Sequence, residues 1–294
     1  MSRLFAELVR QLRKENDMRF FSKDGYKLRQ FRNVREVEEQ LRLPLKECWE
    51  GKSEPPTDEK IKRDTKWYGF PNQESAFQAY FGGWYDESML GRLKVRKPIT
   101  GNDKLRCHTK FDVKGVYPDV SRFMLGLPDN MVEEVFVRKQ SKIVKIIYCP
   151  NAHCGTASEE FLKALTNIVR LVQTLEMNGY RVDLNIYHYF YDQHGRGKVL
   201  SFLLPVKDPD RALNLKRCMF GMGHTASFRI LAFLLCAKDP ESWYIMSYGC
   251  EEWSKGKENL ERFIDTKGTV LINLRDAVSE EKIDNILKQY NVES

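Results

Sequence analysis

The sequence has no apolar run long enough to cross a membrane. Its longest apolar stretch extends from Phe228 to Ala237 and contains Arg229, whereas a spanning helix needs roughly 20 apolar residues. The first apolar run, within residues 1–8, is interrupted by charges, which is not the pattern of a signal peptide. Both absences favour a soluble intracellular protein without a membrane partner.

Motifs that identify a reaction are also lacking. The sequence contains no Walker loop, GxGxxG, HExxH, GxSxG or zinc-finger spacing. The seven cysteines include no CxxC pair, and Cys149 and Cys154 do not have a standard zinc spacing, although His153 lies between them. An odd number of cysteines without a secretory signal is typical of reduced thiols. We therefore expect no structural zinc and no cofactor.

Charge and composition set wider limits. The 294 residues are 42% hydrophobic and 12% aromatic, which is enough for a sizeable core in one large domain or two smaller ones. The net charge of +7 results from 48 basic and 41 acidic residues. The surface is therefore mildly basic, unlike the strongly basic surface of a dedicated nucleic-acid binder. This charge is compatible with a nucleic-acid partner but does not require one.

Residues 141–191 contain the clearest structural pattern. A β-branched run at 143–149 leads into the polar loop 150–156, an amphipathic helix at 158–179 and a second strand at 181–190. The elements expected after these are a strand at 199–206, paired as an antiparallel hairpin, helices at 208–222 and 225–237, a strand at 243–248, a helix at 258–265, a strand at 270–274 and a helix at 279–290. This alternation predicts an α/β domain with a mainly parallel sheet and one antiparallel hairpin strand.

The chain before this domain is less regular. The expected parts are an N-terminal helical region at 1–50, a linker or mobile loop at 51–64, an aromatic-rich α+β region at 65–140 and the α/β domain at 141–294. Amphipathic stripes predict helices at 3–14 and 33–43. In the α+β region we expect a strand at 106–113 and a short helix at 118–125.

Aromatic side chains are concentrated between Trp67 and Tyr85, around a helix expected to start near Asn72. Such a block can stack nucleic-acid bases. Packing in a core or at a domain boundary is the commoner role of clustered aromatics, and we favour it.

Two resemblances follow from these patterns. The order of elements in residues 141–294 is similar to the von Willebrand factor A-like (Rossmann-like) fold, in which the first strand leads into a metal-binding loop. A second resemblance is carried by four segments: Glu74 to Trp84, Gly115 to Pro128, the first strand with its long helix up to Val182, and Gly223 to Arg229. Through these segments the sequence resembles an uncharacterised domain family of bacteriophage genomes. This resemblance implies a phage origin and a fold, since that family has no assigned activity.

The von Willebrand resemblance implies where a metal would bind. That fold has Asp-x-Ser-x-Ser after the first strand, a Thr in a later loop and an Asp after the fourth strand, because hard divalent cations prefer oxygen ligands. Here the first motif falls on residues 151–155, which begin with Asn151 and contain no carboxylate. Thr225 stands in the later loop, and Glu251 and Glu252 follow the expected fourth strand out of pattern. The resemblance therefore implies a degenerate metal site.

Loop 150–156 is the candidate site, because parallel α/β folds bind ligands at the carboxyl ends of their strands. The candidate ligand- or partner-binding residues are Asn151, His153, Cys154, Thr156, Thr225, Arg229 and Glu251. His153 and Cys154 could form a nucleophile–base pair or, with Cys149, a soft-metal site. The commoner arrangement is that Cys149 is a buried strand-end residue, while His153 and Cys154 are loop residues that shape a surface. Arg229, in an apolar helix, either forms a salt bridge or contacts an anion or a partner.

A site-bearing topology without its metal ligands favours a non-enzymatic protein-interaction module, and the resemblance to the phage family implies that it is phage-encoded and acts in virion assembly or against a host system. We expect a phage or host protein as partner, in the host cytoplasm or the virion, and a homo-oligomer is compatible with the sequence. Two other classes stay open. One is a divalent-metal-dependent phosphoesterase or nuclease that uses loop 150–156 with Glu251 or Glu252. The other is a nucleic-acid-binding protein that uses the basic clusters at 92–97 and 138–142.

Overall fold

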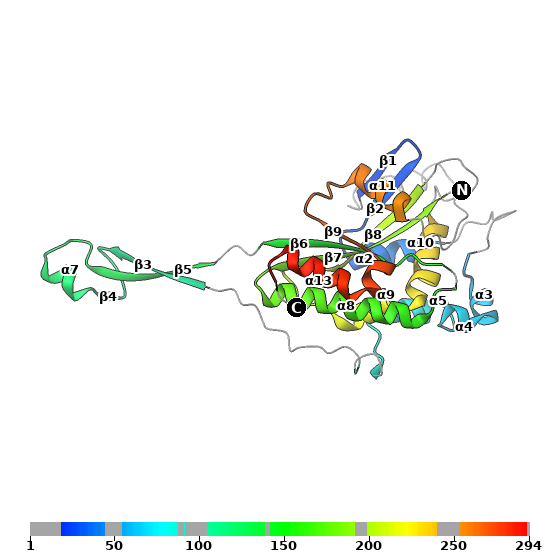
Figure 1. Cartoon of the computed structure of the whole chain (residues 1–294), viewed down its shortest axis with the longest axis horizontal. Helices are drawn as coiled ribbons and strands as arrows, with labels where there is room; N and C mark the ends of the chain where they lie inside the picture. The colour runs from blue at the N-terminus through cyan, green and yellow to red at the C-terminus, as the bar shows by residue number, and fades with distance from the viewer. Residues whose placement is uncertain are drawn as a thin grey trace.

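The structure is a computed structural model that describes residues 19–44, 55–87, 91, 105–138, 142–153, 155–191, 199–239 and 253–292. It is a mixed α/β fold built on a six-stranded, mostly parallel sheet (Figure 1). In order of pairing, the strands are β1 (Arg19–Lys23), β2 (Tyr26–Gln30), β8 (Val199–Lys207), β7 (Arg181–Tyr191), β6 (Ile143–Cys149) and β9 (Val270–Asn273). The β1–β2 and β7–β8 pairs are antiparallel and the other three are parallel. The predicted α/β class and the β7–β8 hairpin are confirmed.

Side chains of β6 alternate between two apolar cores. Ile146 and Tyr148 belong to the larger core, and Ile147 and Cys149 to the smaller one, as the two-residue period of a strand requires. Both faces of the central strands are thus covered, which explains their nearly continuous apolar sequences.

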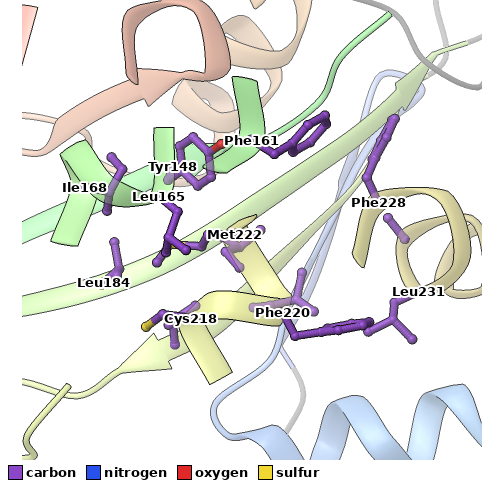
Figure 2. Close-up of a cluster of buried hydrophobic side chains, with 14 of the residues drawn as sticks. Tyr148, Phe161, Leu165, Ile168, Leu184, Cys218, Phe220, Met222, Phe228 and Leu231 are labelled. Carbon is purple, nitrogen blue, oxygen red and sulfur yellow. The ribbon is translucent and has the colours of Figure 1, made fainter. Parts of the chain in front are cut away.

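The larger core lies between the sheet and a layer of helices that includes α8 (Ser158–Met177) and α9 (Leu215–Gly223). Figure 2 shows Phe161, Leu165 and Ile168 of α8 in this core with Cys218, Phe220 and Met222 of α9. The apolar stripe predicted for α8 is buried along its whole length. Each large apolar side chain buried in this way stabilises the fold by roughly 1.5–3 kcal/mol.

The helices after the β7–β8 hairpin differ in detail from expectation. The first begins at Leu215 instead of 208, because Asn214 caps it by accepting a hydrogen bond from the Arg217 amide at 3.1 Å. The second consists of a π-helical segment, η1 (Ser227–Ala232), followed by α10 (Phe233–Lys238). Within the described part of the chain no single helix is long and apolar enough to span a membrane. The pair formed by α9 and η1–α10, bent by 71°, passes that test by length and composition only.

The remaining C-terminal elements are α11 (Trp253–Phe263), β9, α12 (Leu274–Val278) and α13 (Glu280–Gln289). The helix expected at 258–265 therefore begins and ends earlier than predicted, and a short helix precedes the last one. The strand expected at 243–248 lies outside the described residues. In the sheet, the neighbour of β6 opposite β7 is β9, so the loop after β9 reaches the same edge as loop 150–156.

Residues 19–30 correct the predicted N-terminal helical region. They form a hairpin whose turn residues, Asp24 and Gly25, have positive φ angles of 51° and 80°. Its second strand, β2, pairs in parallel with β8, so the sheet extends beyond the predicted 141–294 domain. An Asp-Gly pair is a strong hairpin signal, but β1 is mostly exposed and lacks an alternating apolar face. The helix expected at 33–43 is confirmed as α2 (Val34–Leu41), and that at 3–14 lies outside the described residues.

Residues 55–63 correct the predicted linker at 51–64, of which 51–54 are outside the described residues. They contain α3 (Asp58–Arg63), whose Ile61 is fully buried in the larger core. The Asp58 carboxylate accepts a hydrogen bond of 2.8 Å from the amide of Gln73. The helix was not foreseen because Ile61 is its only apolar residue.

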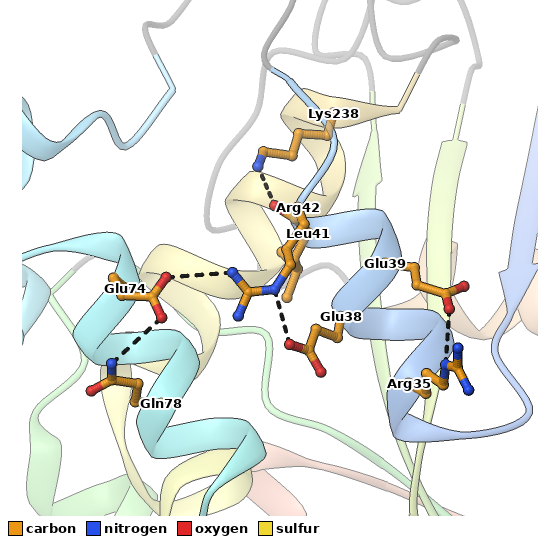
Figure 3. A network of polar contacts seen from close by, with 8 residues as sticks. All are labelled: Arg35, Glu38, Glu39, Leu41, Arg42, Glu74, Gln78 and Lys238. Carbon is orange, nitrogen blue, oxygen red and sulfur yellow. Dashed lines mark hydrogen bonds and ion pairs between the residues drawn. The ribbon is translucent and has the colours of Figure 1, made fainter.

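The aromatic block packs against the same core, as predicted. It contains α4 (Thr65–Tyr68) and α5 (Gln73–Phe81), the latter capped by Asn72. Figure 3 shows how polar contacts join α2, α5 and α10: Arg42 pairs with Glu38 and, at 3.6 Å, with Glu74 of α5, while Lys238 of α10 donates to the carbonyl of Leu41. Buried residues between Phe31 and Tyr80 therefore share the larger core with the predicted C-terminal domain.

Residues 105–138, called the arm below, form a second sheet. The arm contains β3 (Leu105–Asp112), β4 (Tyr117–Pro118), α7 (Val120–Met124) and β5 (Met131–Arg138), with strand order β3-β5-β4 and antiparallel pairing. Figure 1 shows it projecting away from the six-stranded sheet. The predicted strand at 106–113 and helix at 118–125 are confirmed, whereas β4 and β5 were not predicted.

Candidate functional site

A cavity of about 290 Å³ lies at the carboxyl edge of the six-stranded sheet. Loop 150–156 after β6 lines it through Asn151 and Thr156, and the end of β9 lines it through Asn273. These strands are parallel neighbours, and Cys149 at the end of β6 is paired with Asn273. The sequence-predicted loop thus does lie beside a cavity, at the edge where open α/β sheets bind ligands.

Asn151 holds the start of this loop to β7. Its side-chain amide donates a hydrogen bond of 2.6 Å to the carbonyl oxygen of Tyr189, and its side-chain oxygen lies 3.2 Å from Nδ1 of His188. Burial lowers the pKa of His188 to about 3, so its imidazole is neutral at pH 7 and donates from Nδ1 to Asn151. A carboxylate at position 151 could not donate to the Tyr189 carbonyl. The side chain at this position therefore has to donate as well as accept a hydrogen bond, which an amide does and a carboxylate does not.

His153 forms hydrogen bonds within its own turn. Its ring Nδ1 accepts from the amide of Gly155 at 3.2 Å, and its carbonyl accepts from the amide of Thr156 at 3.0 Å. Cys154, its proposed partner in a nucleophile–base pair, lies outside the described residues. Burial raises the pKa of the Cys149 thiol to about 12. Cys149 is therefore protonated at pH 7 and is the buried strand-end residue that the commoner arrangement predicted.

Arg229 ties the loop to α4. Its guanidinium donates to the carbonyl oxygens of Trp67 at 2.7 Å and Thr156 at 3.3 Å, and it stacks on the Trp67 ring at 4.7 Å from the centroid. The side chain is buried and reaches the loop from η1. Arg229 thus positions Thr156 through backbone carbonyl groups and an aromatic ring, and the salt bridge suggested by the sequence stays a prediction.

The other predicted residues are not brought to the cavity. Thr225 is buried and is not one of the cavity-lining residues in the described chain. Glu251 lies outside the described residues, as do the basic cluster at 92–97 and residues 139–141 of the second cluster. Across the described ranges, no group of three or more His, Cys, Asp or Glu side chains could hold a metal ion.

Sequence reasoning missed most of the side chains that line the cavity, among them Tyr189, Trp253, Glu160 and Arg275. Tyr189 and Trp253 form an aromatic wall with ring centroids 6.4 Å apart. Glu160 comes from the first turn of α8 and Arg275 from α12, directly after β9. Arg275 could have been found from sequence only if β9 had been placed beside β6, because that pairing brings the two loops together.

The aromatic block offers little surface for stacking nucleic-acid bases. Tyr68, Phe77 and Tyr80 are buried, and Trp67 is packed against the larger core and under Arg229. Base stacking needs an exposed ring face. The prediction that this block fills a core is therefore confirmed.

No curated protein and no solved structure matches this chain. A family model described as a domain of unknown function, DUF7192, matches residues 16–294, which is nearly the whole sequence. The chain therefore belongs to the DUF7192 family.

Proposed function

We propose that this protein is a phage-encoded, non-enzymatic interaction module that binds another protein through the tip of its arm, residues 110–132. The observation that carries this proposal is a concentration of exposed apolar side chains on the tip. They are Phe111, Val113, Val116, Tyr117, Val120, Phe123, Met124 and Leu125. Val116 and Met124 are each 79% exposed. Exposed apolar side chains gathered in one place are typical of interaction sites.

Polar contacts hold the tip together and leave its apolar side chains free. Arg122 donates to the carbonyl oxygen of Asp129 at 2.9 Å, pairs with its carboxylate, and lies over the ring of Phe111 at 4.4 Å. Asp119 caps α7 by accepting from the Arg122 amide at 2.8 Å. Because these contacts organise α7 without a core of its own, its apolar residues remain available to a partner.

The charges of the tip favour a protein partner. Three basic side chains, Lys110, Lys114 and Arg122, are balanced by three acidic ones, Asp112, Asp119 and Asp129. Anionic membranes and nucleic acids attract surfaces with an excess of Lys and Arg. A protein groove with an apolar floor and charges of both signs at its rim fits this tip better. Each exposed apolar side chain that it buries would contribute roughly 1.5–3 kcal/mol.

Site-specific photo-crosslinking in the full-length chain tests this function. A crosslinker replacing Met124, in phage-infected host cells, is expected to capture one phage or host protein. The same group replacing Leu43, which is also exposed but lies after α2, should not capture it. With the captured protein purified, the double variant Phe123→Ser, Met124→Ser should bind it at least about tenfold more weakly, which corresponds to about 1.4 kcal/mol.

Equal capture from position 43, or unchanged affinity of the double variant, would contradict the proposed binding surface. Co-sedimentation of the protein with vesicles, lost in the double variant, would assign the tip to a membrane surface instead. Retention of the wild type on host nucleic acid that persists in the double variant would favour the nucleic-acid class.

A further inference from the structure

The cavity at the carboxyl edge of the sheet differs in chemistry from the arm. Its volume of about 290 Å³ is at the small end of the range for ligand pockets, and its lining combines charged, hydroxyl and aromatic side chains. A protein that binds the tip of the arm would not contact this cavity, so the proposed function does not explain the residues that line it.

Two opposite charges line the cavity without neutralising each other. Glu160 and Arg275 are both exposed, and neither forms an ion pair or side-chain hydrogen bond within the described chain. A ligand with complementary groups could satisfy both: an anionic group for Arg275, and an ammonium or amino group for Glu160. A simple anion would be attracted by Arg275 and repelled by Glu160.

The aromatic wall adds a preference for a flat ring. Tyr189 is buried, and Trp253, partly exposed, is tilted by 52° against it. Planar ligand groups pack well on such rings. The wall is backed by Tyr187, whose hydroxyl donates to the carbonyl oxygen of Gly256 at 2.9 Å and whose ring contacts Trp253.

The loop that completes the cavity is already fixed. Asn151 holds its beginning to β7, and Arg229 holds its end to α4 through the Thr156 carbonyl. Thr156 lines the cavity, and its hydroxyl forms no hydrogen bond within the described chain. Ordering of this loop in the unbound protein reduces the entropy that binding would lose.

We propose that this cavity binds a small amphoteric molecule with a planar ring, whose anionic group pairs with Arg275 and whose ammonium or amino group pairs with Glu160. The ring packs against Trp253 and Tyr189, and the Thr156 hydroxyl hydrogen bonds to a polar group of the ligand. Aromatic amino acids and nucleoside monophosphates with an exocyclic amine share this chemistry.

Isothermal titration of the full-length protein distinguishes these two sources. The first set of probes is L-tryptophan and L-tyrosine, and the second set is AMP and CMP, each titrated up to millimolar concentration. One of these two sets of probes is expected to bind. Arg275→Gln and Glu160→Gln should each weaken that binding by about tenfold or more, as expected for loss of a charged hydrogen bond. Lys163→Gln and Glu159→Gln are matched controls, since both residues are exposed on α8 and do not line the cavity.

The outcomes separate clearly. Absence of binding by both probe classes, or equal weakening by the control variants, would overturn the proposal. Tighter binding by Glu160→Gln would identify a simple anion site and overturn the amphoteric ligand. The double variant of the arm, Phe123→Ser and Met124→Ser, should keep full affinity for the probe. Failure of the cavity proposal is thereby distinguished from failure of the proposed arm function.

Discussion

The six-stranded body and the arm treat their side chains in opposite ways. In the body even charges are taken into the interior with partners: Asp239 is fully buried and pairs with Arg29, and the buried Lys207 pairs with Glu176. In the arm, charged residues such as Arg122 support the backbone, while apolar ones such as Met124 face water. Folding stability and partner binding should therefore depend on different parts of the chain.

The largest expected loss of stability comes from the buried ion pair of the body. Asp239→Asn keeps the shape of the side chain and leaves Arg29 with an uncompensated buried charge, which is expected to lower the free energy of unfolding by about 3–5 kcal/mol. Urea denaturation measures this loss. The matched control is Glu39→Gln, which breaks the exposed pair of Arg35 and Glu39 on α2 and should have no measurable effect. Equal losses of stability in the two variants would mean that the buried ion pair contributes no more to the free energy of unfolding than the exposed one.

The next effect depends on pH and tests the anchor of the candidate site. His188 has its pKa lowered to about 3 by burial, against about 6.5 in an unfolded chain. Below pH 6.5 the unfolded state binds a proton that the folded state excludes, so stability falls as the pH falls, by up to about 1.4 kcal/mol per pH unit. Above pH 6.5 this contribution is constant.

His188→Gln should remove this part of the pH dependence. The measurement is the free energy of unfolding of wild type and variant at several pH values between about 7 and 4.5. His224, whose pKa is lowered to about 4 by burial, contributes the same slope to both proteins and cancels in the difference. Parallel pH profiles would show that His188 does not exclude a proton in the folded state.

A smaller loss of stability is expected at the start of loop 150–156. Asn151→Asp removes the amide group that donates to the Tyr189 carbonyl and places one acceptor against another. This should lower the free energy of unfolding by about 1–3 kcal/mol. If loop 150–156 were a metal site that lacks only its aspartate, the variant would instead be stabilised by Mg²⁺. Thermal unfolding with and without millimolar Mg²⁺ decides between the two results.

The predictable part of the fold is the part with strong periodicity. The β-branched run of β6 and the apolar stripe of α8 indicated a strand, a loop and a helix at nearly the observed positions. The β1–β2 hairpin and α3 were missed for a common reason: each is short and contributes few buried side chains. Such elements are defined by their contacts with a distant part of the chain, and local sequence patterns do not contain those contacts.

In the candidate site, too, the residues marked by a local sequence pattern were predicted, and those brought together by distant contacts were missed. Asn151 and Thr156 were predicted because they follow a strand, and both line the cavity. Arg229 was singled out as a charge in an apolar helix, and its buried contacts with two carbonyl groups explain why it is tolerated there. Glu160 and Arg275 were not predicted, because their meeting depends on the pairing of β6 with β9, which are more than a hundred residues apart.

The smallest expected effect on stability is in the arm, and it is the sharpest test of the comparison with the body. Met124 is 79% exposed, so Met124→Ser should change the free energy of unfolding by no more than about 0.5 kcal/mol. The same substitution should weaken binding of the captured partner, because it removes apolar surface that the partner would bury. Urea denaturation and titration with the partner measure the two quantities on one variant. A stability loss above about 1 kcal/mol with unchanged partner binding would mean that Met124 packs within the folded chain, and the arm would then resemble the body.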